Sequence, residues 1–265
     1  MTTTIMKIRT LFLSLLLVAG INDICAQNRV TDVRRDGFVG RVRQVSSNMY
    51  EAVSDDDNVQ RGDLLEKTQT TYSAKGERRG MVYFSVAEED VMFRSRYKRD
   101  AFGQTTLEQI VDGDENVIGR TYYIYDPNFY LVESYVEDAE RQVECRTLYK
   151  YDGAGRVSHR SLNDPENNVY RREVYTYNAD GTVLKVVVYD REKKKMQELR
   201  YEYDDHRQPV TLMRYDYTEE EPEVFITIYR YRYDDNGNWV QKTEYSEDGG
   251  MANAEYITER TIEYF

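Results

Sequence analysis

The sequence predicts an all-β protein built from repeated antiparallel β-hairpins, and three observations support this fold class. Residues 146–156 read R-T-L-Y-K-Y-D-G-A-G-R, with two tyrosines two positions apart, then an aspartate and a glycine-rich turn. The same phrase returns along the chain at a nearly constant spacing. Tyrosine is far commoner than phenylalanine, at 25 against 8 residues, and only four prolines interrupt a chain of 265 residues.

Each copy of the phrase predicts one strand and the turn that ends it. Tyr149 and Tyr151 are two residues apart, so both side chains point to the same face of a β-strand. Asp152 ends the strand because its short carboxylate accepts hydrogen bonds from turn N–H groups. Gly153 and Gly155 can adopt the positive φ that tight turns need. One copy is therefore half a hairpin with its turn.

The later copies predict the same turn chemistry. We expect the side chains of Asp152, Asn178 and Asp234 to form hydrogen bonds with the turn backbone. We also expect positive φ at Gly181 and Gly237, which stand at the left-handed position of their turns.

The spacing of the copies predicts a repeat architecture. The second tyrosine of the phrase stands at Tyr125, Tyr151, Tyr177, Tyr203 and Tyr233, so the copies are 26, 26, 26 and 30 residues apart. Weaker copies end at Tyr72 and Tyr97. Twenty-six residues hold two strands of about eight residues and two short turns. Because the period is even, the tyrosines keep to one face from copy to copy.

The number of strands predicts a strongly curved sheet. Two strands per repeat give roughly sixteen strands, and a flat open sheet rarely exceeds about ten without curling. We expect consecutive strands to pair as an antiparallel meander. We further expect the sheet to form a long, curved, open or solenoid-like array, or a partly closed shell. Residues 54–63 form the longest polar stretch and are expected to be a loop.

The start of the chain predicts export from the cytoplasm. Lys7 and Arg9 precede an apolar run at residues 11–21, which is too short to span a bilayer. We expect residues 1–26 to be a signal peptide cleaved after Ala26, with a lipid-anchored Cys25 as the alternative. Residues 27–265 then form one repeat domain with no integral membrane segment. The mature chain keeps a single cysteine and therefore no internal disulfide.

The phrase resembles a known family. Y-x-Y-D-x-x-G-R at residues 149–156 is similar to the YD repeat of bacterial Rhs-type proteins. The closing stretch at 234–265 contains N-G-N-W-V-Q-K-T-E-Y and Y-I-T-E-R-T-I-E-Y-F. Together with Gly40-Arg41-Val42 near the start, it resembles short exported YD-repeat proteins of the Bacteroides kind. The resemblance covers residues 36–265 and implies an exported β-repeat protein.

Charge and motifs exclude several kinds of site. The net charge of −12 argues against nucleic acid as a partner. The two histidines, His159 and His206, have no nucleophile or metal ligand at a recognisable spacing. Residues 112–116 imitate the start of an EF-hand, but Tyr123 stands where a bidentate glutamate is required. A polar hairpin turn is the better interpretation. We expect no cofactor, no metal and no catalytic residues.

The first tyrosines of the phrase are the candidate binding face. Tyrosine is favoured over phenylalanine where the ring packs while the hydroxyl reaches water or a polar partner. Two interpretations follow: the rings form a ladder that stabilises neighbouring strands, or they form a platform for a glycan or peptide. The ladder is the better supported of the two. The candidate residues are Tyr123, Tyr149, Tyr175, Tyr201 and Tyr231.

These features predict a non-enzymatic exported repeat protein of the cell envelope that binds a glycan or another envelope protein. Its location would be periplasmic, outer-membrane-associated or secreted, and its oligomeric state stays open. Two alternatives are a carbohydrate-active enzyme on the β-scaffold and an outer-membrane β-barrel component. Against the barrel, neither predicted strand face carries an apolar band, and the mean hydropathy is −0.77.

Overall fold

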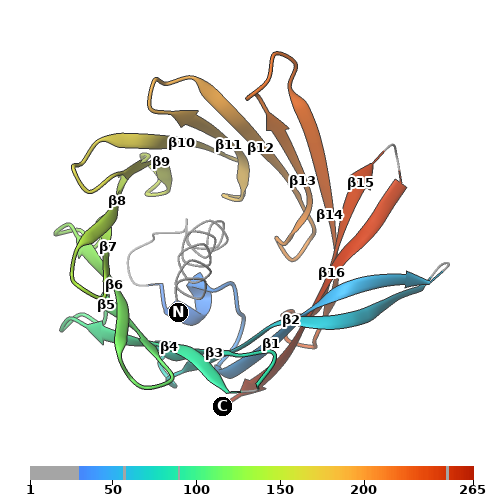
Figure 1. Ribbon diagram of the computed structural model, residues 1–265, viewed down its shortest axis with the longest axis horizontal. Helices are drawn as coiled ribbons and strands as arrows, with labels where there is room; N and C mark the ends of the chain where they lie inside the picture. The colour runs from blue at the N-terminus through green and yellow to red at the C-terminus, as the bar shows by residue number, and fades with distance from the viewer. Residues whose placement is uncertain (1–29, 56–57, 89, 249–250) are drawn as a thin grey trace.

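The computed structural model describes residues 30–55, 58–88, 90–248 and 251–265. In this part of the chain, sixteen antiparallel strands form a closed barrel with one short helix inside the ring (Figure 1). The predicted signal peptide, its cleavage site and Cys25 lie outside the described residues. No helix in the described ranges is long and apolar enough to cross a membrane.

The strands follow one another around the barrel in chain order. The elements are α2 (Asp32–Arg35), β1 (Val42–Asp55), β2 (Asn58–Tyr72), β3 (Arg78–Phe84), β4 (Val91–Arg99), β5 (Thr105–Asp112), β6 (Val117–Tyr125), β7 (Leu131–Asp138), β8 (Val143–Tyr151), β9 (Val157–Asn163), β10 (Val169–Tyr177), β11 (Val183–Asp190), β12 (Lys195–Tyr203), β13 (Pro209–Asp216), β14 (Glu223–Tyr233), β15 (Trp239–Asp248) and β16 (Met251–Tyr264). The predicted meander of consecutive antiparallel strands is confirmed.

The predicted open or solenoid-like array is wrong, because the first and last strands pair with each other. β1 and β16 are antiparallel neighbours, with Val42 opposite Tyr264 and Tyr50 opposite Ile257. An open sheet of this length would leave two edges with unpaired N–H and C=O groups, and closure removes both. Strand tilt and stagger set the number of strands at which a sheet can close. The spacing of one hairpin repeat in the sequence does not determine this stagger, so closure was not predicted.

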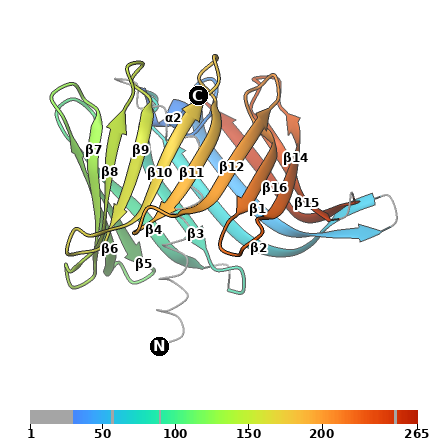
Figure 2. The same cartoon turned by 90° about the horizontal axis from the view of Figure 1, so that it is seen from above.

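Residues 54–63 also differ from prediction, since they belong to a long hairpin instead of a loop. Ser54 pairs with Val59 and Asp55 with Asn58, so β1 and β2 continue to a two-residue connection. The pair projects from the barrel wall as an arm (Figures 1 and 2). Its composition is polar because most of its described side chains are exposed or only half-buried, which hides the alternation expected of a strand with one buried face.

Most hairpins carry a β-bulge where the return strand begins. Lys150 pairs with His159 while Tyr151 pairs with Val157, so the residue between them has no counterpart. The same shift in register occurs beside Tyr125, Tyr177 and Tyr203. A bulge increases the local twist of the ribbon, which favours the curvature of a closed barrel.

The predicted turn chemistry is confirmed at most positions. Asp152 accepts hydrogen bonds from the N–H groups of Ala154 and Arg156, both at 2.9 Å. Asp234 does the same for Asn236 and Asn238 at 3.0 and 2.9 Å. The φ angles of the two predicted glycines, at positions 181 and 237, are 89° and 81°.

The turn at Asn178 differs from the prediction. Its side-chain amide donates to the hydroxyl of Thr182, and Asp180 accepts the backbone N–H of Thr182 instead. The predicted hairpin turn at 112–116 is confirmed, since Asp112 accepts the N–H groups of Asp114 and Asn116.

The helix identifies the inner face of the barrel. Figure 1 shows α2 in blue inside the ring, and Figure 2 places it near the end that holds the C-terminus. Val33 and Phe38 form a buried cluster with Val42, Val45 and Tyr72 of the adjoining wall. Tyr72 therefore points inward. Tyr97 contacts Arg78 and shares Glu108 with Tyr123, so these tyrosines lie on the same face, and the even period of 26 residues keeps the next copies there.

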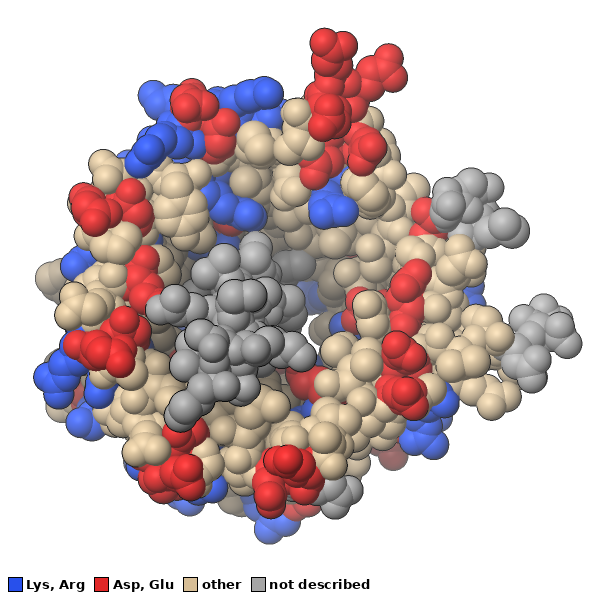
Figure 3. All heavy atoms as spheres, viewed as in Figure 1, with Lys and Arg blue, Asp and Glu red and all other residues tan. Residues whose placement is uncertain are grey.

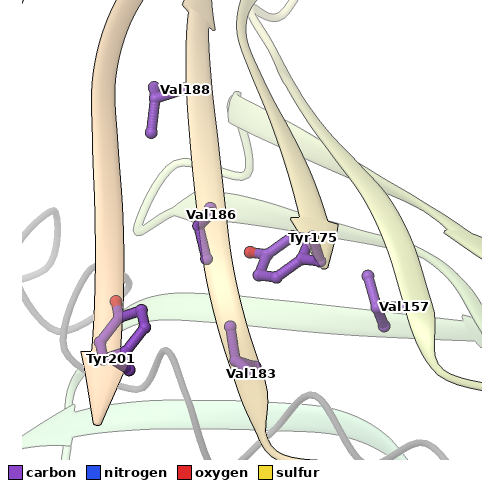
Figure 4. Close-up of a cluster of buried hydrophobic side chains, with 6 residues drawn as sticks. All are labelled: Val157, Tyr175, Val183, Val186, Val188 and Tyr201. Atoms are coloured by element: carbon purple, nitrogen blue, oxygen red, sulfur yellow. The ribbon is translucent and has the colours of Figure 1, made fainter. Parts of the chain in front are cut away.

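The largest apolar cluster lies on this inner wall, across β9 to β12. It consists of Val157, Tyr175, Val183, Val186, Val188 and Tyr201 (Figure 4). Instead of one central core, the barrel has apolar clusters along its wall and polar groups between them.

Candidate functional site in the barrel lumen

The five predicted tyrosines all lie on the inner wall of the barrel. They occupy β6, β8, β10, β12 and β14, so one strand separates each from the next. Tyr175 and Tyr201 are buried, with exposed fractions of 9% and 7%. Tyr123, Tyr149 and Tyr231 are partly exposed.

The row of tyrosines is oblique to the strand pairing. Tyr149 lies opposite Arg160, and Arg160 lies opposite Glu173, two residues before Tyr175. Likewise Tyr175 is level with Leu199, two residues before Tyr201. Each repeat is thus displaced by two residues, as expected for the tilted strands of a barrel. The even displacement keeps every ring on the inner face.

The last member of the predicted row is displaced further. Tyr201 pairs with Leu212, and Leu212 pairs with Thr227, so the two-residue stagger leads to Tyr229. Tyr231 lies one step beyond, because β14 has 11 residues where β12 has 9. Tyr229 therefore continues the row. The prediction chose Tyr231 instead because it counted back from the turn that follows β14.

The second tyrosines have a structural task that explains the preference over phenylalanine. Tyr151 donates its hydroxyl to the carbonyl oxygen of Leu131 at 2.6 Å, and Leu131 is the first residue of its bulged return strand. The same bond recurs at three further second tyrosines, from Tyr125 to Thr105, Tyr177 to Val157 and Tyr203 to Val183, at 3.0, 2.6 and 2.8 Å. In the last repeat the first tyrosine, Tyr231, donates to Pro209 at 2.9 Å, while Tyr233 donates to the side chain of Asp204. A bulge leaves a carbonyl without its ladder partner, and a phenol satisfies it.

Three of the first tyrosines contact side chains of the lumen through their hydroxyls. Tyr123 donates to Glu108 at 3.0 Å, and Tyr175 donates to Glu173 at 2.6 Å. The hydroxyls of Tyr149 and Ser134 are 3.3 Å apart. These bonds engage the hydroxyls, and Tyr123 and Tyr149 remain partly exposed.

Glu173 is the centre of a buried charged network. Its carboxylate meets Arg160 at 2.7 Å and Arg171 at 2.8 Å, and only 2% of the residue is exposed. Burial alone would raise the pKa of Glu173, but the charge of Arg160 and the hydrogen bonds of Arg160 and Tyr175 hold it below its ordinary value. The cluster is thus ionised and internally paired.

A second network fixes the helix segment to the wall, and sequence reasoning missed it. Arg99 meets Asp32 at 2.7 Å, and Tyr72 donates to Asp36 at 2.6 Å. Arg78 forms an ion pair with Asp36 as well. These residues come from distant parts of the chain, so no local pattern signals the contact. The segment stays at one end of the lumen.

A third group surrounds the only tryptophan of the chain, and we call it the Trp239 cluster. The guanidinium carbon of Arg260 lies 3.3 Å from the centroid of the Trp239 ring and 5.1 Å from that of Phe38. The ammonium of Lys242 lies 5.7 Å from the Trp239 ring, and the Tyr231 ring is 6.0 Å away. The presence of a single tryptophan was the signal that could have pointed here. The cluster consists of Phe38, Tyr229, Tyr231, Trp239, Lys242 and Arg260.

The outer wall carries charge in the middle of its strands. Arg146 pairs with Glu133 at 2.6 Å, and Arg200 pairs with Glu198 at 2.6 Å. The guanidinium of Arg230 lies 4.7 Å from the ring of Tyr245. Acidic side chains also recur around the rim seen in Figure 3. The outer wall is therefore a mixture of charged, aromatic and branched residues.

The described residues contain no group of three or more histidine, cysteine, aspartate or glutamate side chains that could hold a metal ion. Cys145 is a free thiol on the inner face of β8, two residues before Thr147. His206 stacks on Tyr233, with ring centroids 3.9 Å apart. Both residues thus have a packing environment that accounts for them.

Comparison with known proteins gives a likeness in fold. A porin-like protein from Bacteroides uniformis matches with a TM-score of 0.57 and 10% identity, over 85% of this chain and 99% of that chain. The two share the fold alone. No protein-family model matches the sequence, and no curated protein matches it. The relationship to YD-repeat proteins therefore stays a prediction.

Two other structures are less similar. A porin-like protein from Bacteroides vulgatus gives a TM-score of 0.47 at 12% identity, over 84% of this chain and 98% of that chain. The TcdB2-TccC3-Cdc42 structure gives 0.34 at 16% identity, over 80% of this chain and 11% of that chain. Both scores are too low to extend the comparison. The closed barrel is nevertheless the architecture that the outer-membrane alternative requires.

Proposed function

We propose that this chain is a non-enzymatic β-barrel protein of the cell envelope whose lumen binds an extended polar ligand, such as a glycan chain. The observation that carries the proposal is the set of partly exposed tyrosine rings on the inner wall, among them Tyr123 and Tyr149. A barrel of sixteen strands is wide enough to hold an aqueous channel. Rings and polar groups can therefore meet a solute inside it.

The chemistry of the wall suits a sugar. Aromatic faces pack against the C–H surfaces of a sugar ring, while nearby polar side chains exchange hydrogen bonds with its hydroxyls. Glu108 and Ser134 stand beside Tyr123 and Tyr149 and supply such groups. Because the hydroxyls of the second tyrosines from Tyr125 to Tyr203 bond bulge carbonyls, the partly exposed first tyrosines Tyr123 and Tyr149 are the better candidates for ligand contact.

The outer wall favours a barrel that stands in water. An arginine or lysine facing lipid at the bilayer midplane of a β-barrel costs about 2–4 kcal/mol. Arg146 and Arg200 lie within their strands on the outer face, each with an acidic partner. We therefore place the protein in the periplasm, at a membrane surface or outside the cell.

An outer-membrane barrel is the second candidate function, and the closed ring of strands favours it. Extraction of cell envelopes with carbonate or urea separates the two. A barrel in water is released into the soluble fraction, whereas a membrane-embedded barrel stays in the pellet until detergent is added.

Binding to a panel of soluble oligosaccharides tests the proposed ligand site. We expect saturable binding of at least one glycan, and a loss of tenfold or more in the Tyr123→Ser/Tyr149→Ser variant. Tyr122, which precedes the inward-facing Tyr123 and stacks on Tyr135 on the outer face, gives the matched control Tyr122→Ser. Absence of binding to the whole panel, or an equal loss in the control, would contradict the proposal.

A further inference from the structure

We propose that Arg260 forms an anion-binding subsite in the lumen, which takes the oxyanion of an acidic ligand. The carboxylate of a uronic acid and a phosphate group share this chemistry. The inference rests on the proposed function, because it places part of the ligand inside the barrel, and it adds the charge that the ligand carries.

Arg260 is held by aromatic rings instead of an acid. It lies on β16, opposite Ser47 of β1, and its side chain meets Trp239 and Phe38 on the inner face. Within the described ranges no carboxylate lies within 4.0 Å of its guanidinium, and its Nε is buried without a hydrogen-bond partner. The residue as a whole keeps partial exposure. The guanidinium of Arg260 thus lies at the inner wall with no anionic partner among the described residues.

Four other inward-facing arginines have the acidic partner that Arg260 lacks. Arg78 pairs with Asp36, Arg99 with Asp32, and both Arg160 and Arg171 with Glu173. Burying a charge is costly unless a counter-charge and hydrogen bonds compensate for it. The described residues therefore supply an acid partner to each of these four arginines and none to Arg260.

The nearby acid is already occupied. Asp36 is engaged by Arg78 and by the hydroxyl of Tyr72. Burial lowers the pKa of Arg260 to about 9, against the opposing influence of Tyr72 and Asp36. The group is still cationic at neutral pH, so a ligand anion would meet a full charge.

The surroundings suit an acidic sugar. A guanidinium binds a carboxylate or phosphate through two parallel hydrogen bonds. Trp239 and Tyr231 stand beside it with their rings 6.0 Å apart, which offers aromatic faces to a sugar ring. Lys242 is already paired with Glu244 at 2.6 Å, so the unmatched charge belongs to Arg260.

Trp239 provides a direct probe, since it is the only tryptophan of the chain and touches Arg260. The full mature protein is titrated with sodium glucuronate, glucose and inorganic phosphate at constant ionic strength set with sodium chloride, and tryptophan fluorescence is recorded. We expect a saturable change with glucuronate and none with glucose. A response to phosphate without one to glucuronate would support the oxyanion subsite and assign it to phosphate.

Variants distinguish anion binding by Arg260 from a purely structural role in packing between Phe38 and Trp239. Arg260→Gln should raise the dissociation constant for the anion at least tenfold, while Arg232→Gln, on the exposed outer face of β14, should change it less than twofold. If Arg260→Gln fails to fold by circular dichroism, Arg260→Lys replaces it, and a rise of threefold or more is expected because the lysine lacks the fork.

Three results would overturn the subsite: no saturable response of the wild type to either anion, an equal response to glucose, or an anion response that survives in the folded Arg260 variant. Glycan binding that depends on Tyr123 and Tyr149 is measured separately. If that binding persists while the anion response is absent, the proposed function stands and only the subsite fails.

Discussion

The hydroxyl of Tyr151 donates a hydrogen bond to the backbone carbonyl of Leu131 at 2.6 Å. The bond joins the end of β8 to the start of β7 and satisfies a carbonyl at a bulge. The second tyrosines of three other repeats form the same link, and Tyr231 forms it in the last repeat, so these hydroxyls stabilise the barrel wall. This is the ladder interpretation of the tyrosine pattern, with a specific partner for each hydroxyl.

Removing one such hydroxyl should destabilise the barrel. In Tyr203→Phe the ring stays, but the carbonyl of Val183 loses its donor at 2.8 Å. We expect the free energy of unfolding to fall by about 1–2 kcal/mol, since a buried carbonyl is left unpaired. Urea denaturation measures it, with Tyr122→Phe on the outer face as the control, expected within about 0.5 kcal/mol of the wild type. Equal stabilities for both variants would disprove the role of the hydroxyl.

The Glu173 network should make stability depend on pH. Glu173→Gln leaves Arg160 and Arg171 without their counter-charge and should cost about 3–5 kcal/mol at pH 7. In the folded protein the pKa of Glu173 lies below its ordinary value of 4.5, because the influence of Arg160 and the hydrogen bonds exceeds that of burial. The stabilisation is therefore present above pH 4.5 and is lost as the pH falls through the folded pKa.

Urea titrations at pH 7 and at pH 3.5 check this prediction. The difference in stability between wild type and Glu173→Gln should be largest at pH 7 and smaller at pH 3.5. A difference that stays constant, or that grows on acidification, would show that the ionised carboxylate is not what holds the two arginines.

The turn at Gly237 should tolerate no β-branched residue. Its φ of 81° lies in the left-handed region, so Gly237→Val is expected to destabilise by about 1 kcal/mol or more. Gly153 gives a matched control in an equivalent turn: its φ is not in that region, and a Cβ there would meet no atom within 4 Å. Thermal unfolding of Gly237→Val and Gly153→Val should rank them in that order, and the reverse order would refute the assignment.

The contact between α2 and the wall should depend on Asp36. Asp36→Asn removes the charge that meets Arg78 and weakens the acceptor of Tyr72. We expect hydrogen exchange to rise at residues 32–38 while β8 to β12 stay protected. Asp235→Asn, at an exposed turn, serves as the control. Unchanged protection of residues 32–38 would mean that the apolar contacts of Val33 and Phe38 suffice to hold the segment.

Much of this fold was predictable from the sequence, because strands and turns depend on local patterns. The phrase at Tyr149–Tyr151–Asp152 indicates a strand, its face and its turn, and the even period gives the meander. Closure depends on the pairing of β1 with β16, more than 200 residues apart, and on a stagger that no single repeat reveals. The absence of an apolar band argued against a membrane, but a sheet closes through its edges whatever surrounds it.

The candidate site was predictable only where it follows the repeat. The face shared by Tyr123, Tyr149, Tyr175 and Tyr201 follows from periodicity. Periodicity does not reveal that Tyr229, and not Tyr231, continues the row, because this depends on the length of β14. The contact of Arg260 with Trp239 and Phe38 joins three separate segments, and tertiary structure alone brings them together.

Covalent closure of the barrel is the most direct test of the central claim, that the chain forms a ring around a tyrosine-lined lumen. Asn48 on β1 and Glu259 on β16 are paired residues. In a Cys145→Ser background, the double variant Asn48→Cys/Glu259→Cys should form an intramolecular disulfide on mild oxidation and keep its native circular dichroism, because directly paired strand positions suit disulfide geometry. An open array would hold these residues at opposite edges of the sheet. Oxidation would then leave the monomer uncrosslinked, or give only dimers whose yield rises with concentration, and either result would contradict the barrel.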